Sequence, residues 1–438
     1  MGSTRIHALS VSGRAALVAV ILTIASLGQV TAGESATVSA RAALDWNLNA
    51  VNAVRAAHTM DGVASGGAPR TLYQTEGLIY MSYVQAAVYD ATMKISNRYK
   101  LYHHFNAKAG NASIEAAVIS AAYLTLAAYL GDADGSLAAK YSADIGRLPA
   151  DNRTSRGVAV GRAASADIVA LRANDGRNAA VPFACPTTTT PGAWQCAPGS
   201  IQTEQTPWLA VMRPFLLVSD SQFRAPATPA LNDSQYIADL NEVHYQGGSN
   251  VETTVHKPIA LFWNLNAINQ LNQTLRDVAT QHNMDLVDTV HLLAMGELIP
   301  TDAGIACFDS KYHYMFWRPI TAIRAGGDMA WNPLVVTPNY MEYPSQHGCV
   351  TSALAQVISS ALGTQNINVT IYGAPVTGTT PVPRTYATVA DIDNQLVDAR
   401  VWIGFHYRNS VVVGETLGHS VAAWTLARYF LPKQDEED

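Results

Sequence analysis

The sequence is organised around residues 311–319, KYHYMFWRP, in its last third. Lys311 and Arg318 are seven residues apart, which is nearly two turns of an α-helix, so the spacing predicts two cations on one helix face. Arg318 precedes Pro319, and we expect the helix to end there, because a residue before proline is pushed out of helical geometry. The residues between the two cations are mostly aromatic or apolar. They favour a buried anion site over the alternative, a solvated basic face.

A second stretch, residues 343–348 (YPSQHG), lies at the predicted start of another helix. Ser345 precedes an apolar run that ends near Gly363, so these two residues are the expected N-cap and C-cap. The backbone amides at such a helix start can bind an anion. His347 stands beside them and can titrate near neutral pH. The alternative is an ordinary capped helix with an incidental histidine.

A third stretch, residues 400–408 (RVWIGFHYR), contains Arg400 and His406. Their separation of six residues does not place them on one face of an unbroken helix. Gly404 lies between them, so either the helix bends there or the two side chains approach a site from two sides. A core helix with a buried, hydrogen-bonded histidine is the alternative.

Together the patterns Lys-x6-Arg-Pro, Pro-Ser-x-His and Arg-x5-His resemble the superfamily of vanadium-dependent haloperoxidases and type-two phosphatidic-acid phosphatases, in order and in spacing. The resemblance implies an all-α fold and one site for a tetrahedral oxyanion. The residues that would hold the oxyanion are Lys311, Arg318, Ser345, Gln346, Arg400 and His406.

In the haloperoxidases of this superfamily the last histidine, here His406, binds vanadate, and the histidine of the second motif, here His347, exchanges protons. The lysine, here Lys311, polarises hydrogen peroxide, and a halide attacks to give hypohalous acid for a small organic acceptor. In the phosphatases, phosphate is the substrate group: His406 would be the nucleophile and His347 would protonate the leaving group. A helical scaffold with a decayed site is the third alternative.

The length of the chain and its repeated helical plan favour the haloperoxidase branch. Phe308 and Tyr340 stand where that branch lines its halide pocket, although ordinary core packing would also explain them. Three departures from the family pattern bear on the site. Gln346 replaces a glycine and either crowds the anion or donates its own amide group. Ala399 replaces a serine, and Ser410 replaces an aspartate that would orient the last histidine.

The amino terminus resembles a secretory signal, with Arg5 and Arg14 as a charged start, an apolar run from Ala15 to Ile24 and small residues 30–32 as a cleavage site. We therefore expect a secreted or periplasmic protein without a stable membrane span. Removing residues 1–32 removes two arginines and no acid, which changes the net charge from −6 to −8. An acidic chain disfavours nucleic acid and anionic membranes as partners, and it is compatible with a homo-oligomer.

The four cysteines fit an exported chain. Cys185 and Cys196 bracket a loop rich in threonine and proline, and we expect them to form a disulfide. If the first two motifs line one pocket, Cys307 and Cys349 also come close enough to bond. Neither spacing is typical of a zinc site.

The chain divides into an amino-terminal helical bundle (33–175), a loop-rich connector (176–256), a carboxy-terminal bundle with the oxyanion site (257–431) and an acidic tail (432–438). The block WNLNAVN at Trp46 is nearly repeated as WNLNAIN at Trp263, and Asp-Ala follows each block, at Asp90 and Asp302. We interpret this echo as an internal duplication in which one half is a scaffold. Residues 365–387 predict a short hairpin.

Overall fold

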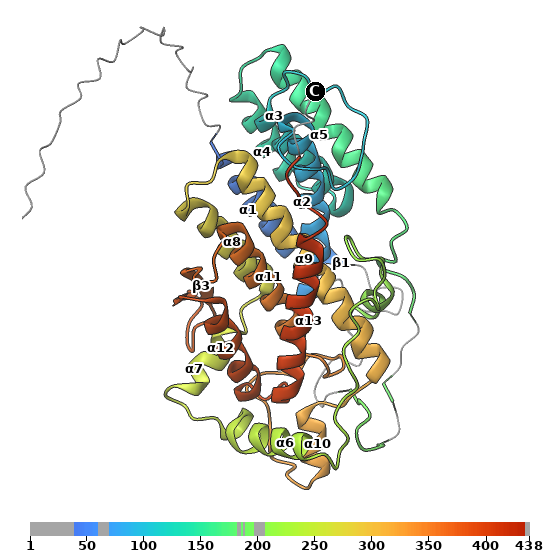
Figure 1. Cartoon of the computed structure of the whole chain (residues 1–438), viewed down its shortest axis with the longest axis vertical. Helices are drawn as coiled ribbons and strands as arrows, with labels where there is room; N and C mark the ends of the chain where they lie inside the picture. The colour runs from blue at the N-terminus through green and yellow to red at the C-terminus, as the bar shows by residue number, and fades with distance from the viewer. Residues whose placement is uncertain (1–38, 60–69, 182–184, 187–188, 197–205, 434–438) are drawn as a thin grey trace, which may run out of the picture. The chain divides into compact units, whose positions relative to one another are not determined.

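The computed structural model describes residues 39–59, 70–181, 185–186, 189–196 and 206–433 (Figure 1). The proposed signal segment, residues 1–32, and most of the acidic tail lie outside these ranges. The prediction of an all-α fold is confirmed. The first helices are α1 (Arg41–Ala56), α2 (Gln74–Ser96), α3 (Ile114–Leu130), α4 (Ser136–Gly146) and α5 (Asn152–Leu171).

The second half of the described chain is also helical, and it contains the three motifs. Its helices are α6 (Ser234–Gln246), α7 (His256–Phe262), α8 (Ala267–Gln281), α9 (Leu286–Tyr314), α10 (Pro319–Ala325), α11 (Gln346–Leu362), α12 (Val389–Trp402) and α13 (Arg408–Leu426). The predicted hairpin is confirmed as β3 (Val369–Gly373) paired with β4 (Val382–Tyr386). A second, two-residue pair joins β1 (His58–Thr59) to β2 (Arg70–Thr71).

The two longest helices, α2 and α9, are buried nearly all round and pack against each other. Helix α9 also contacts α11 and α13, and α2 contacts α3 and α5, so one core runs through both halves (Figure 1). Helix α13 packs closely against the start of α11. A Cβ on Gly414 would lie only 2.7 Å from the carbonyl oxygen of Ser345, so a glycine is needed for this packing.

The long irregular middle region is confirmed, with only the 3-10 helices η2 (Pro207–Val211) and η3 (Gly248–Asn250) between α5 and α7 besides α6 in the described chain. The predicted disulfide between Cys185 and Cys196 is present. Its loop pairs with the chain between Lys311 and Arg318: Trp194 N donates to Met315 O at 2.7 Å, and Trp317 N donates to Gly192 O at 3.1 Å.

The two copies of the Trp-Asn block have different local structures. The first lies within α1, whereas the second spans the end of α7 and the start of α8. The later Asp-Ala pairs are more alike, because Asp90 and Asp302 are both buried in long helices and both accept hydrogen bonds from loop amides. The duplication and the domain boundaries stay predictions.

One predicted helix boundary is wrong. Helix α9 ends at Tyr314, not at Arg318, because Met315 has a left-handed conformation (φ 49°). Arg318 is instead the N-cap of α10, with Pro319 as its first residue. Lys311 and Arg318 therefore do not share a helix face, and a turn between two helices brings them together.

Candidate active site

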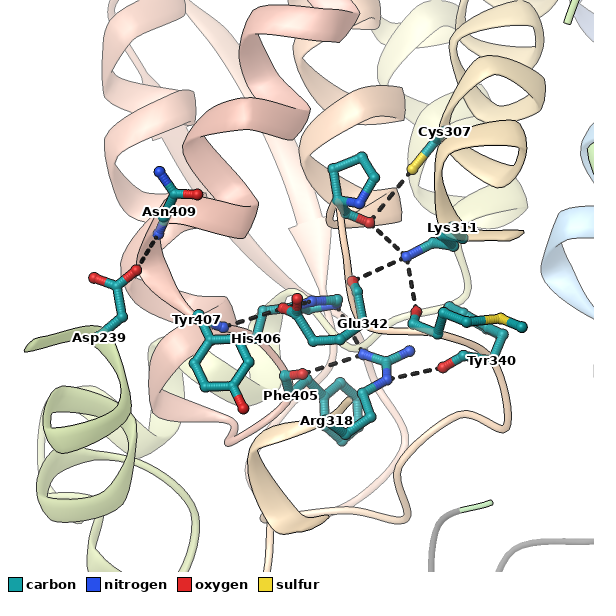
Figure 2. Close-up of polar contacts among 12 residues, drawn as sticks. Asp239, Cys307, Lys311, Arg318, Tyr340, Glu342, Phe405, His406, Tyr407 and Asn409 are labelled. Atoms are coloured by element: carbon teal, nitrogen blue, oxygen red, sulfur yellow. Dashed lines mark hydrogen bonds and ion pairs between the residues drawn. The ribbon is translucent and has the colours of Figure 1, made fainter. Parts of the chain in front are cut away.

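Lys311, near the end of α9, is fully buried. Its ammonium group donates hydrogen bonds to the carbonyl oxygens of Met341 at 3.0 Å and Glu342 at 3.1 Å, and to that of Pro344 (Figure 2). These carbonyls lie on the segment that leads into α11, so Lys311 joins the first motif to the second. Burial lowers the pKa of Lys311 to about 8.

Arg318 is also fully buried. Its Nε donates to Tyr340 O at 2.9 Å, and its Nη1 donates to Phe405 O at 3.1 Å (Figure 2). The guanidinium lies over the Tyr340 ring, with 4.9 Å between Cζ and the ring centroid. Arg318 therefore links the first motif to the third.

The second motif forms the start of α11, as predicted. Ser345 is the N-cap and Gly363, in a left-handed conformation, is the C-cap. Ser345 is fully buried, but its hydroxyl accepts no capping bond and has no hydrogen-bond partner in the described chain. An N-cap serine whose hydroxyl is free at a helix start is suited to bind an anion together with the backbone amides.

His347 lies in the first turn of α11 and is partly exposed. Burial of its ring and the nearby cations Arg400, Lys311 and Arg318 hold its pKa well below its usual range. The three cations that surround the predicted site therefore also act on His347, which indicates that the positive potential extends to this ring.

The third motif contains the bend that one of our two alternatives required. Helix α12 ends at Trp402, Gly404 takes a left-handed conformation (φ 86°), and α13 begins at Arg408. A Cβ on Gly404 would lie 2.9 Å from Trp331, so both the conformation and the packing require glycine. Arg400 is buried at the end of α12 and donates to Trp263 O at 3.0 Å. Burial lowers its pKa to about 9.

His406 lies in this bend, with its ring between Arg318 and Glu342 (Figure 2). Its Nε2 is 3.2 Å from Arg318 Nη1, and its Nδ1 is 2.8 Å from Glu342 Oε1. A guanidinium can only donate, so Nε2 must accept and the imidazole proton is on Nδ1. Burial and the surrounding cations hold the pKa of His406 well below its usual range. The ring is neutral, and the lone pair of Nε2 faces the cations.

Glu342 is a residue of this cluster that the motifs did not predict. It is fully buried, and burial raises its pKa to about 7 although Arg318 and Lys311 act in the opposite direction. Ser410 stands at the position where the family pattern has an aspartate, and its hydroxyl also lowers the pKa of Glu342. The carboxylate that contacts His406 therefore comes from another element, and not from position 410. The only sequence signal was an acid three residues before Ser345.

Helix α6 holds the segment that carries His406. Asp239 accepts a hydrogen bond from Asn409 N at 2.9 Å (Figure 2), and Glu242 binds the guanidinium of Arg408 at 2.7 Å. Both contacts fix the first turn of α13. They therefore limit movement of His406, two residues earlier.

The two residues predicted for a halide pocket lie beside this cluster. Phe308 and Tyr340 are both buried, and their ring centroids are 5.4 Å apart. Tyr340 contacts both cations of the first motif, since Lys311 Nζ is 5.2 Å from its ring centroid. Cys307 and Cys349 are buried free thiols and do not form a disulfide in the described chain, and Cys307 Sγ donates to Pro344 O at 3.5 Å.

The cluster has buried donors that nothing in the described chain satisfies: Arg318 Nη2, Arg400 Nε and Ser345 Oγ. Such groups are costly to bury without a partner. Three cationic side chains face the single carboxylate of Glu342, so the cluster fits a multiply charged oxyanion. By contrast, the described residues contain no group of three or more His, Cys, Asp or Glu side chains suited to a metal cation.

Comparison with known proteins finds a family model that matches the carboxy-terminal third of the chain. Residues 291–431, which contain all three motifs, match the family model of the VCPO second helical-bundle domain. This part of the chain is similar to the second helical bundle of that family. The resemblance predicted from the motifs is therefore confirmed. No curated protein gives a significant sequence match.

Solved structures of the superfamily extend the likeness to the fold of most of the chain. A bacterial vanadium-dependent iodoperoxidase has a TM-score of 0.74 and 20% identity, with coverage of 90% of this chain and 98% of that chain. The holo form of a bacterial vanadium-dependent chloroperoxidase has a TM-score of 0.68 and 18% identity, with coverage of 85% and 96%.

Proposed function

We propose that this protein is a vanadate-dependent haloperoxidase that oxidises a halide with hydrogen peroxide and passes the oxidised halogen to a small organic acceptor. The observation that carries the proposal is the neutral imidazole of His406. Its Nε2 lone pair faces buried cations, and a carboxylate fixes its tautomer. That is the form of histidine that binds a metal centre.

Each residue of the cluster then has a role. His406 Nε2 would be the vanadate ligand, and Lys311, Arg318 and Arg400 would balance the negative charge of the oxygens. Ser345 Oγ and the backbone amide of Gln346 would donate hydrogen bonds. Bound vanadate would supply a Lewis-acidic centre that polarises hydrogen peroxide. His347, with its low pKa, would accept a proton from the peroxide as it binds and return a proton to the departing oxygen.

The phosphatase alternative uses the same anion site, so an activity assay must separate the two. The vanadate-free protein should be incubated with vanadate and then supplied with peroxide and iodide or bromide. The proposal expects halide oxidation that depends on vanadate. Phosphatase activity without vanadate, together with no halide oxidation, would support the alternative. If neither activity nor anion binding appeared, the site would be a decayed one.

The variant that tests the role of His406 as the vanadate ligand is His406→Ala. It should remove halide oxidation and most of the vanadate affinity while circular dichroism shows the same helix content as wild type. Unchanged turnover in the folded variant would exclude His406 from the mechanism. We also propose that the protein is exported, as its amino terminus predicts.

A further inference from the structure

Arg224, in the loop-rich connector, binds the end of helix α9. It forms two hydrogen bonds with Asp309, from Nε at 2.7 Å and from Nη2 at 2.6 Å. The Asp309 side chain is only 8% exposed, and a bidentate arginine–carboxylate pair fixes its geometry better than a single contact does. Next to Arg224, Ala225 N donates to the Ser310 hydroxyl at 2.9 Å. Both contacts therefore fix the turn of α9 that directly precedes Lys311.

The same stretch of the connector also contacts the chain that enters α11. Tyr343 OH, in the second motif, donates to Pro226 O at 2.8 Å. Tyr314 OH, at the end of α9, donates to Ala225 O at 2.7 Å. The two tyrosine rings pack edge to face, with 5.6 Å between their centroids. Residues 224–226 therefore join the end of α9 to the second motif, and we call them the connector strap.

The hydrogen bonds of Lys311 span the two parts that the connector strap joins. An ammonium group has three N–H donors, and Lys311 directs them to the carbonyl oxygens of Met341, Glu342 and Pro344. The donor lies on α9, whereas the three acceptors lie around Tyr343, which the strap holds. If α9 moved away from the second motif, these bonds would lengthen and the cation would change its position.

We infer that the connector strap positions Lys311 for anion binding, and that Arg224 is a positioning residue of the oxyanion site. Arg224 acts through Asp309 and the last turns of α9, and the strap keeps these turns at a fixed distance from the chain that enters α11. The inference rests on the oxyanion site of the proposed function, but not on halide oxidation. The alternative is an ion pair that only stabilises α9.

Arg98 provides a matched control for Arg224. It binds Asp285 at the opposite end of the same helix, with distances of 3.1 and 2.8 Å. The two arginine side chains are similarly exposed, 40% for Arg98 and 36% for Arg224. Arg224→Met and Arg98→Met therefore each remove one arginine–carboxylate pair from α9, but only Arg224→Met disrupts the connector strap.

A second pair of variants removes a single hydroxyl group each. Tyr343→Phe removes the donor to Pro226 O, and Tyr89→Phe removes a donor to Lys100 O, both at 2.8 Å. Tyr89 lies on α2 and contacts neither the strap nor the motifs through this bond. If Arg224→Met did not fold, this pair would decide the question alone.

Phosphate affinity is the first measurement. Arg224→Met should raise the phosphate Kd by roughly tenfold, the lower end of the range for losing a group that orients a ligand, and Tyr343→Phe should raise it in the same direction. Arg98→Met and Tyr89→Phe should stay within about twofold of wild type, as expected for distant, independent sites. Equal changes in the strap variants and their controls would overturn the inference, because the contacts would then only stabilise the fold.

An NMR signal of Lys311 measures its position directly. A buried ammonium held by three carbonyls exchanges its protons slowly with water, so its 1H–15N signal should be visible in the anion-free protein below its pKa of about 8. The signal should persist in both controls and should shift or broaden in both strap variants. An unchanged signal in the strap variants, or no signal in wild type, would overturn the inference. Neither measurement uses turnover, so an enzyme that oxidised no halide would contradict the proposed function alone.

Discussion

Glu342 contacts Nδ1 of His406 and so leaves Nε2 facing the proposed oxyanion site. Its Oε1 accepts a hydrogen bond from His406 Nδ1 at 2.8 Å and another from Tyr407 N at 3.2 Å. These two hydrogen bonds fix the orientation of the His406 ring. They also favour the tautomer in which Nδ1 carries the proton and Nε2 carries none. Groups that orient a ligating histidine in this way usually contribute about 10–100-fold to metal affinity.

We therefore expect Glu342→Gln to weaken vanadate binding by roughly 10–100-fold. The glutamine can present its amide NH2 group to Nδ1, which would move the proton to Nε2 and occupy the lone pair that we propose binds vanadate. Titration of the variant with vanadate, with circular dichroism as a check on folding, measures the effect. Equal vanadate affinities would show that Glu342 only fills space.

Ser410 offers a test of the departure from the family pattern. Because its hydroxyl lies close enough to Glu342 to lower that pKa, Ser410→Asp alone should place two carboxylates together and reduce stability. In a Glu342→Gln background the same aspartate should restore part of the vanadate affinity. A double-mutant cycle measures the coupling, and additive effects of the two changes would contradict it.

Lys311 should make anion binding depend on pH. Burial lowers its pKa to about 8, and an anion favours the protonated form. Affinity is therefore fully present below that pH and is lost as the pH rises through it. Between about pH 7.5 and 9 we expect the phosphate Kd to approach a tenfold increase per pH unit from this one proton.

The control for this prediction is Lys311→Arg, because a guanidinium stays protonated throughout the range. The ratio of the wild-type Kd to the variant Kd cancels the titration of phosphate itself. That ratio should increase above about pH 8. A flat ratio would show that Lys311 remains charged without the anion.

The disulfide loop stabilises the turn between Lys311 and Arg318. The loop between Cys185 and Cys196 pairs with residues 315–317 through two main-chain hydrogen bonds. Replacing both cysteines by serine should lower the free energy of unfolding by roughly 2–3 kcal/mol, as expected for a loop of this length. It should also weaken vanadate binding, because the turn positions both cations. If the folded variant bound vanadate as tightly as wild type, the disulfide would contribute to stability and not to vanadate binding.

The sequence could predict the limits of helix α11 but not the end of helix α9. The limits of α11 were predictable because Ser345 and Gly363 are local capping signals. The end of α9 was not, because the left-handed residue Met315 pairs with Trp194, more than a hundred residues earlier. The motifs likewise predicted the residues that converge on the cluster. Glu342 acts through a contact with His406 that no spacing within one motif encodes.

Export of the protein stays a prediction. We expect the mature chain to begin near Gly33 and to contain neither Cys185 nor Cys196 as a free thiol. Intact-mass spectrometry after alkylation, with and without reduction, measures both. An unprocessed amino terminus, or alkylation of both thiols without reduction, would contradict export to an oxidising compartment. Within the described part of the chain no helix is long and apolar enough to cross a membrane.

The oxyanion site also joins elements across the second half of the chain, so ligand binding should stabilise the whole fold. Lys311, Arg318, Ser345 and Arg400 come from the ends of four different helices, and His406 comes from the bend between α12 and α13. An anion that binds only the folded chain adds about 2.7 kcal/mol at a hundred times its Kd. It also relieves the repulsion between buried cations. We therefore expect both phosphate and vanadate to raise Tm.

The two anions should respond differently to His406→Ala. Phosphate is held by the cations and hydrogen-bond donors alone, so the variant should keep most of the Tm increase that phosphate gives. Under the proposed function vanadate would also gain a bond to Nε2, so the variant should lose most of the difference between the two anions. Thermal scans at matched saturation measure both shifts. If His406→Ala lost the two increases equally, the histidine would act as one more hydrogen-bonding group, and the proposal of a vanadate ligand would fail.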